Sequence, residues 1–194
     1  MGDLNLTFIR HGQGIHTLNP PDSLRIKNPS LTQKGIGQAK LLRRQFPLSK
    51  NDFIIISPTR RTLQTALIWS NDTQCRKIID PRVSPRMFPQ KTEGLTLPCD
   101  EIMEIEDIRN EFPIFALDEH LSTELWTNGI NTMPDREFEV LGERFLGWCK
   151  QQSKGNVYIV SHDGTITSYR QLISNRLFTR DDFLDDGGWI NILY

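Results

Sequence analysis

Leu6-Thr7-Phe8-Ile9-Arg10-His11-Gly12-Gln13 is the stretch of sequence that decides the fold of this 194-residue chain. Its apolar residues predict a buried strand, which ends at an Arg-His-Gly turn. A glycine at that point lets backbone amides approach a ligand closely. Arg10 beside His11 could bind an oxyanion and present an imidazole to it. The same three residues also form ordinary turns, so only the rest of the chain can separate the two interpretations.

The composition is that of a globular protein. Hydrophobic residues make up 37% of the chain and charged residues 24%, and the length suits one domain, residues 1–194. The net charge of −1 gives no basic excess, so neither a nucleic acid nor a membrane is expected as a partner. Three cysteines without a Cys-x-x-Cys pair indicate neither a disulfide framework nor a zinc site. No signal-peptide pattern is seen, and a cytoplasmic location is the expectation.

Strands and helices alternate over the first half of the chain. Thr32 is expected to cap the first helix, which follows a long loop over 12–30. The expected elements are a helix to about 46, a buried strand over 53–57, a helix over 59–69 and a strand over 76–83. This order is typical of an α/β domain with a mainly parallel sheet.

The second half begins with a segment, 84–134, that prolines interrupt and that holds one or two helices. We expect it to form an insertion over the active site, with substrate walls. A helix is then predicted from Asp135, a strand over 156–161, a further helix after 164 and a terminal strand over 189–194.

Three of the predicted strands end in polar residues. Ligands of open α/β sheets bind beyond the carboxyl ends of the strands, so these turns should meet at one edge. Histidines and arginines that converge there suit phosphoryl transfer through a histidine, because guanidinium groups pair with phosphate oxygens and a neutral imidazole is a nucleophile. The three turns are Arg10-His11-Gly12, Ser57-Pro58-Thr59-Arg60-Arg61 and Ser161-His162-Asp163-Gly164.

Four segments in order along the chain resemble the histidine phosphatase superfamily, the phosphoglycerate mutase-like proteins. The resemblance implies a three-layer α/β/α sandwich with a mainly parallel sheet. The matching segments are Phe8-Ile9-Arg10-His11-Gly12-Gln13, Leu31-Thr32-Gln33-Lys34-Gly35-Ile36-Gly37-Gln38-Ala39, Ser57-Pro58-Thr59-Arg60-Arg61-Thr62-Leu63-Gln64-Thr65-Ala66 and Ser161-His162.

The resemblance also implies roles for individual residues. His11 is then the nucleophile, and Arg10, Arg61 and His162 bind phosphate; Arg60 falls outside the motif's arginine position. Thr17 stands where the family often has an asparagine that touches phosphate. Gln13 and His16 are assigned to the substrate pocket, Gln13 through its backbone and loop packing, and His16 either there or in ordering the loop.

The proton donor has two candidates. Glu93 lies in a stretch that resembles the family's "REHxGxxPCD" segment, although one residue is missing between the glutamate and the proline. Asp163 follows His162, as an acidic donor does in the acid phosphatase branch. Asp100 is predicted to be structural, for instance as a helix cap.

The function predicted from these residues is metal-independent hydrolysis of a small phosphomonoester through a phosphohistidine. The alternatives are a phosphoglycerate-type mutase and a non-catalytic phosphate-binding module of the same fold. No cofactor is expected, and the four histidines lack the pairwise spacing of a metal site, His120 being expected at the surface. Neither the substrate nor the oligomeric state follows from the sequence.

Overall fold

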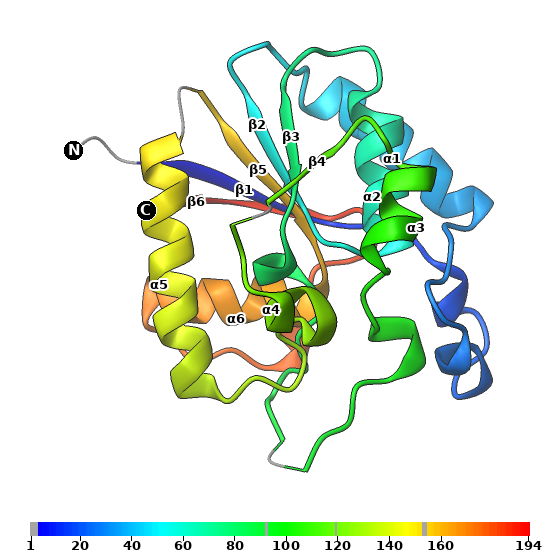
Figure 1. Ribbon diagram of the computed structural model, residues 1–194, viewed down its shortest axis with the longest axis vertical. Coiled ribbons are helices and arrows are strands. Elements are labelled where there is room, and N and C mark those ends of the chain that lie inside the picture. The colour runs from blue at the N-terminus through cyan, green and yellow to red at the C-terminus, as the bar shows by residue number, and fades with distance from the viewer. Residues whose placement is uncertain (1–3, 92, 119, 153–154) are drawn as a thin grey trace.

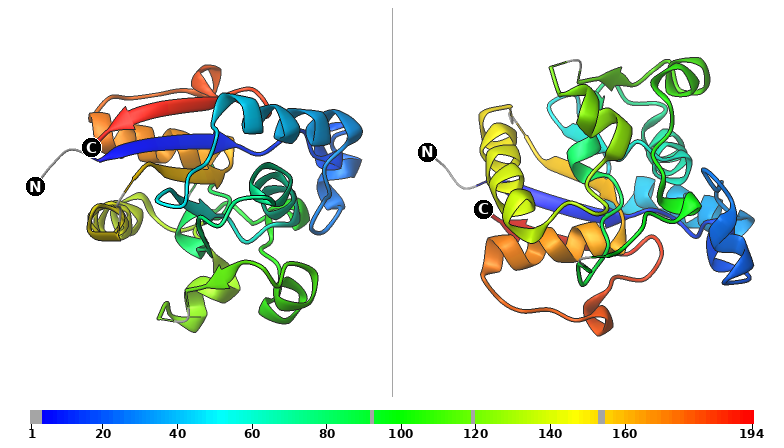
Figure 2. Two further views of the ribbon diagram at one scale, coloured as in Figure 1. Left: turned by 90° about the horizontal axis from the view of Figure 1, so that it is seen from above. Right: turned by 60° about the horizontal axis from the view of Figure 1, so that its bottom comes forward.

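The computed structural model describes residues 4–91, 93–118, 120–152 and 155–194. Within these residues, a six-stranded sheet in the order β4-β3-β2-β5-β1-β6 has helices on both sides (Figures 1 and 2). The strands are β1 (Asn5–Arg10), β2 (Phe53–Ile56), β3 (Arg76–Ile79), β4 (Ala116–Leu117), β5 (Val157–Ser161) and β6 (Trp189–Leu193). The α-helices are α1 (Gln33–Gln45), α2 (Arg60–Ser70), α3 (Ile105–Glu111), α4 (Thr123–Asn128), α5 (Asp135–Gln152) and α6 (Asp163–Ser174).

The register of the central strands brings their carboxyl ends together. All strand pairs are parallel except β1 with β6, which confirms the mainly parallel sheet. β5 lies between β1 and β2, with Arg10 opposite Ser161 and Ile56 opposite Val160. The next residue along each of the three strands therefore emerges at the same edge of the sheet.

Two apolar cores separate three layers. Side chains alternate between the faces of a strand, so neighbouring residues of β1 enter different cores. Phe8 packs with Phe145 of α5 and Tyr169 of α6, whereas Ile9 packs on the side of α2 with Leu63. The α5–α6 layer and the α1–α2–α3 layer thus cover opposite faces, as the left view of Figure 2 shows, and the α/β/α sandwich is confirmed.

The start of α1 packs directly on the loop after β1. Thr32 caps α1, as predicted, and its side chain accepts a hydrogen bond from Gly35 N at 3.0 Å. A Cβ atom on Gly12 would lie 2.4 Å from the carbonyl oxygen of Gly35, so both positions need glycine for this close approach. The contact fixes the chain that follows His11.

The prediction of a strand over 76–83 is wrong in its second half. β3 ends at Ile79, and Pro81–Val83 form a 3₁₀ helix. Asp80 caps this turn by accepting from Arg82 N at 2.8 Å, and the proline has no N–H with which to continue a strand ladder.

The 84–134 segment contains two helices, α3 and α4, as predicted, and also the short edge strand β4, which the sequence did not indicate. Its two residues pair with Ile78 and Ile79 at the edge of the sheet.

Among the described residues, no helix combines the length and the hydropathy needed to cross a membrane.

Candidate active site

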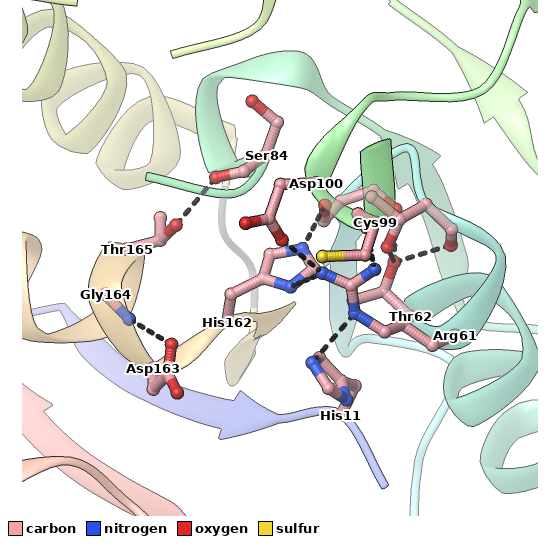
Figure 3. A network of polar contacts seen from close by, with 12 residues as sticks. His11, Arg61, Thr62, Ser84, Cys99, Asp100, His162, Asp163, Gly164 and Thr165 are labelled. Atoms are coloured by element: carbon pink, nitrogen blue, oxygen red, sulfur yellow. Dashed lines mark hydrogen bonds and ion pairs between the residues drawn. The ribbon is translucent and has the colours of Figure 1, made fainter. Parts of the chain in front are cut away.

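The side chain of Arg61 is the centre of the site at the carboxyl edge of β1, β2 and β5 (Figure 3). Arg61 is the second residue of α2, and only 1% of it is exposed. Its Nε donates to Nε2 of His11 at 3.0 Å, and its Nη2 donates to Nδ1 of His162 at 3.0 Å. One guanidinium therefore joins the two histidines that the sequence assigned to the chemistry.

The remaining hydrogen bonds of Arg61 reach the 84–134 segment. Nη1 donates to the carbonyl oxygen of Cys99 at 2.6 Å, and Nη2 donates to Oδ1 of Asp100 at 3.0 Å. Asp100 belongs to a 3₁₀ helix (Pro98–Asp100), while the residue that caps α3 is Glu104. The prediction of Asp100 as a helix cap is therefore wrong: the carboxylate is bound by the central cation of the site.

His11 is held in an orientation that leaves one ring nitrogen, Nε2, without a proton and therefore able to attack. Its Nδ1–H donates to the carbonyl oxygen of Gly12 at 2.7 Å, which leaves the lone pair of Nε2 directed at Arg61. Burial, and then the charge of Arg61, lower the pKa of His11 well below its usual range. The imidazole is thus neutral at neutral pH, which is the form that a nitrogen nucleophile requires.

His162 lies beside His11, with ring centroids 5.0 Å apart. Its Nδ1 accepts from Arg61, so Nε2 carries the proton and donates to Oγ of Ser57 at 2.7 Å. Burial and Arg61 also lower the pKa of His162 well below its usual range. Ser57, the residue after β2, fixes this tautomer; the sequence comparison quoted Ser57 but gave it no role.

The local field favours an anion. Burial lowers the pKa of Arg61, although Asp100 opposes the shift. The first turn of α2 contains no acidic residue, and Thr59 makes no side-chain cap, so the positive end of the helix adds to the charge of Arg61. A phosphate group bound at this point would be attracted both by the guanidinium of Arg61 and by the positive end of α2.

Arg10, the other predicted phosphate ligand, is engaged differently. Its Nη2 lies 3.1 Å from Asp163 and 3.0 Å from Asp186, and its Nη1 donates to Leu184 O at 2.5 Å. The guanidinium is therefore occupied by carboxylates from the C-terminal part of the chain. It lies at the same strand end as His11.

The remaining predicted pocket residues lie in the loop after His11. His16 is buried, its ring centroid is 5.7 Å from that of His11, and its Nδ1 has no hydrogen-bond partner among the described residues. Thr17 is exposed and donates to the carbonyl oxygen of Gly14 at 2.9 Å. Gln13 accepts from the hydroxyl of Thr32 at 2.9 Å, so its side chain binds α1.

The two predicted proton donors have different environments. Glu93 is exposed and makes no hydrogen bond or ion pair with another described residue. Asp163 is the first residue of α6; Oδ1 accepts from Gly164 N at 2.7 Å, and Oδ2 pairs with Arg10 at 3.1 Å.

A cavity of about 190 Å³ lies next to these groups and has Asp100 and Asp163 in its wall. Larger hollows of about 320, 580 and 740 Å³ lie elsewhere and include no residue that contacts Arg61. None of the four is lined by a site histidine, but the small cavity includes Asp100, which binds Arg61. The wall of the small cavity is about equally polar and apolar, with two acids, two arginines and an asparagine beside apolar side chains. Its lining residues are Arg86, Met87, Phe88, Leu95, Leu97, Asp100, Asn131, Asp163, Gly164, Arg180 and Phe183.

Two motif glutamines support the site, and neither was assigned a role from the sequence. Gln38 accepts from Gln13 N at 2.8 Å, and Gln64 accepts from Leu31 N at 2.8 Å. Each anchors the loop after His11 to a helix. Their regular place in the matched segments was a signal, but it did not say which backbone they would bind.

The part of the chain that the structure describes contains no candidate metal site. No group of three or more histidine, cysteine, aspartate or glutamate side chains there is arranged to hold an ion. The position between the two imidazoles is occupied by a guanidinium, which is itself a cation. The site therefore supplies positive charge through Arg61.

Comparison with known proteins places this geometry in a family. A curated relative, phosphoglycerate mutase-like protein 1 of Arabidopsis thaliana, is 26% identical over 190 residues, covering 81% of this chain and 67% of that protein. Two solved structures share the fold: an alpha-ribazole phosphatase from Shigella flexneri and a phosphoserine phosphatase from Entamoeba histolytica. The Shigella protein has a TM-score of 0.62 and 23% sequence identity, and the Entamoeba protein has a TM-score of 0.61 and 22% identity. Each match covers 97% of this chain and 89% of the other protein's chain. The family model of the histidine phosphatase superfamily (branch 1) matches residues 6–180, and the chain belongs to that family.

Proposed function

We propose that the chain is a metal-independent phosphomonoester hydrolase that acts through a phosphohistidine on His11. The observation that carries the proposal is the orientation of the His11 ring: Nδ1–H donates to the Gly12 carbonyl, which leaves Nε2 unprotonated and facing the buried Arg61 guanidinium. The phosphatases among the proteins of similar fold support the same class of reaction.

In the first step, the substrate phosphate binds the guanidinium of Arg61. It replaces the hydrogen bonds that this guanidinium donates to His11 and His162 in the free protein. The charge of the phosphate favours a proton on Nδ1 of His162, which then donates to a phosphoryl oxygen. Nε2 of His11 attacks phosphorus, an N–P bond forms and the ester P–O bond breaks. A carboxylic acid gives its proton to the departing alkoxide oxygen.

In the second step, water attacks the phosphohistidine. The carboxylate left by the first step takes a proton from the water, the N–P bond breaks, and inorganic phosphate leaves. Glu93 and Asp163 are the donors proposed from the sequence, and Asp100 is a third carboxylate at the site.

The substrate proposed is small. Its alcohol part would enter the 190 Å³ cavity, whose walls include Leu95, Leu97 and Phe183. Thr17, His16 and Gln13 belong to the loop after His11 and do not line this cavity; His16 lies beside the His11 ring.

The test is turnover of p-nitrophenyl phosphate in the presence of a metal chelator, beside His11→Ala. The native chain should release phosphate, and base-quenched protein should carry a phosphoryl group on the peptide that contains His11. The exposed histidine His120 provides the matched control, His120→Ala, which should retain activity. No turnover by the native chain, or equal turnover by His11→Ala, would overturn the proposal. Turnover only with an added bisphosphorylated cofactor would indicate a mutase.

A further inference from the structure

The acid that serves the leaving group must lie on a defined side of the phosphate. In-line attack places the leaving oxygen opposite Nε2 of His11, across the phosphorus atom. The alcohol then extends into the adjoining cavity, so the proton donor should be a carboxyl group in the wall of that cavity. Two carboxylates among the described residues fulfil this condition, Asp100 and Asp163.

Glu93 does not meet the condition. Its side chain is exposed, it makes no hydrogen bond with another described residue, and it is not part of the cavity wall. The missing residue between Glu93 and Pro98, relative to the segment that it resembles, shortens this loop.

Asp163 lies in the cavity wall, but both of its oxygens are already bound. Oδ1 accepts from Gly164 N at 2.7 Å, and Oδ2 lies 3.1 Å from Nη2 of Arg10. These contacts tie the side chain to the start of α6 and to the guanidinium of Arg10. Neither oxygen is therefore left without a partner to deliver a proton to the leaving group.

Asp100 has the opposite environment. Its Oδ1 touches the same guanidinium that binds His11, while Oδ2 makes no hydrogen bond with another described residue. The side chain is 29% exposed, and Asp100 forms part of the cavity wall. Figure 3 shows its carboxylate beside the His162 ring and the Arg61 guanidinium.

The burial of Asp100 also favours a carboxylic acid. Burial raises its pKa, Arg61 opposes this, and the neighbouring Asp163 adds to the rise. A bound phosphate would take hydrogen bonds of Arg61 and bring further negative charge close to Asp100. Both changes favour the protonated form at the moment when the leaving oxygen needs a proton.

We propose that Asp100 is the proton donor to the leaving alcohol, and that its carboxylate then activates the water that cleaves the phosphohistidine. This proposal rests on the proposed function of the site. The proton passes from Asp100 to the alkoxide oxygen as the P–O bond breaks, and it is regained from water as the N–P bond breaks. Asp163 is then a positioning residue that holds Arg10.

The experiment compares Asp100→Asn with Asp163→Asn and Glu93→Gln on aryl phosphates whose leaving groups differ in basicity. Loss of a general acid costs on the order of 10²–10⁴-fold, and it matters most for a basic leaving group. Asp100→Asn should therefore lose at least about 100-fold on phenyl phosphate but less than about tenfold in phosphohistidine formation from 2,4-dinitrophenyl phosphate. Asp163→Asn should lose similar factors on both substrates. Glu143→Gln, on the exposed side of α5, is the matched control for a carboxylate-to-amide change.

A second measurement uses the phosphoenzyme. Asp100→Asn should accumulate phosphohistidine with 2,4-dinitrophenyl phosphate, because its breakdown lacks a base, and Asp100→Glu should recover part of the turnover. An equal loss on both substrates would overturn the proposal, and so would a leaving-group-dependent loss in Glu93→Gln or Asp163→Asn. Failure of the proposed function would look different, since the native chain would then form no phosphohistidine at all.

Discussion

Two buried arginines near the carboxyl ends of the central strands are held in contrasting ways. Arg82 binds Asp80 through Nε, at 3.0 and 3.1 Å, and through Nη2, at 2.6 Å, and it lies 3.3 Å from Asp118. Arg61 has one carboxylate partner, Asp100, at one oxygen, and its other partners are two imidazoles and a carbonyl.

The pKa values follow this difference. Burial alone would lower the pKa of Arg82, but its bonds to Asp80 overcome the effect and raise it. Burial lowers the pKa of Arg61, and Asp100 does not fully offset it. The charge of Arg82 is therefore matched within the fold, whereas that of Arg61 is incompletely matched and has capacity for an anion. The comparison separates an arginine that stabilises the fold from one that binds a ligand.

Arg61→Met should produce the largest functional effect. We expect kcat/KM for p-nitrophenyl phosphate to fall on the order of 10⁴-fold, as expected for removal of an arginine that stabilises a transferring phosphoryl group. The free energy of unfolding should change by less than about 1 kcal/mol, because the Asp100 carboxylate left behind is partly exposed to water. Steady-state kinetics and urea unfolding measure the two effects; a loss of stability of 3 kcal/mol or more would break the comparison.

Arg82→Met should show the reverse pattern. The carboxylate of Asp80, which is fully buried, would lose its cation, and the free energy of unfolding should fall by about 3–5 kcal/mol. The folded fraction should keep kcat/KM within a few-fold of the native value. The double variant Asp80→Asn, Arg82→Met removes both charges and should recover much of the stability. A double variant no more stable than the single one would contradict this account of the pair.

Inorganic phosphate should stabilise the fold through Arg61. At a concentration ten times its Kd, we expect a gain of about 1.4 kcal/mol in the free energy of unfolding. The gain should vanish in Arg61→Met and persist in the Asp80→Asn, Arg82→Met variant. Thermal unfolding at graded phosphate concentrations is the measurement. An unchanged gain in Arg61→Met would show that the anion binds elsewhere.

The smallest effect concerns His16 and pH. Burial, then Arg61 and Arg10, lower the pKa of His16 to about 3. Below about pH 6.5 the unfolded chain takes up a proton that the folded chain does not, so stability falls as the pH drops from 6.5 towards 3. Between pH 7.5 and 6.0 this costs about 0.8 kcal/mol, which His16→Gln should remove. Urea unfolding at both pH values tests it, with the exposed His120→Gln as the matched control. Equal losses in the native chain and His16→Gln would contradict the expectation.

The sequence predicted the meeting of His11, Arg61 and His162 because parallel strands bring their ends to one edge. The observed register, with Arg10 opposite Ser161, is the physical basis of that success. The alternation of predicted strands and helices, together with capping residues such as Thr32, allowed most helix ends to be predicted.

The environment of Asp100 could not be predicted in the same way. Its contact with Arg61 spans 39 residues and depends on the path of an irregular, proline-interrupted segment. Neither a hydrophobic periodicity nor a helix-capping residue in the sequence specifies the path of such a segment. The turn at Asp80 was missed because the apolar residues before it resemble a continuing strand. The strand ends where Asp80 caps the 3₁₀ helix that starts at Pro81.

The position of β5 between β1 and β2 bears on the order in which the protein is made. Neighbouring strands lie about 4.8 Å apart, so the ends of β1 and β2 are separated by the width of the strand between them. Residues 157–161 supply that strand late in synthesis. A nascent chain that carries His11 and Arg61 but has not yet released β5 from the ribosome lacks the spacer that sets their contact. The site is therefore completed only after most of the chain has been translated.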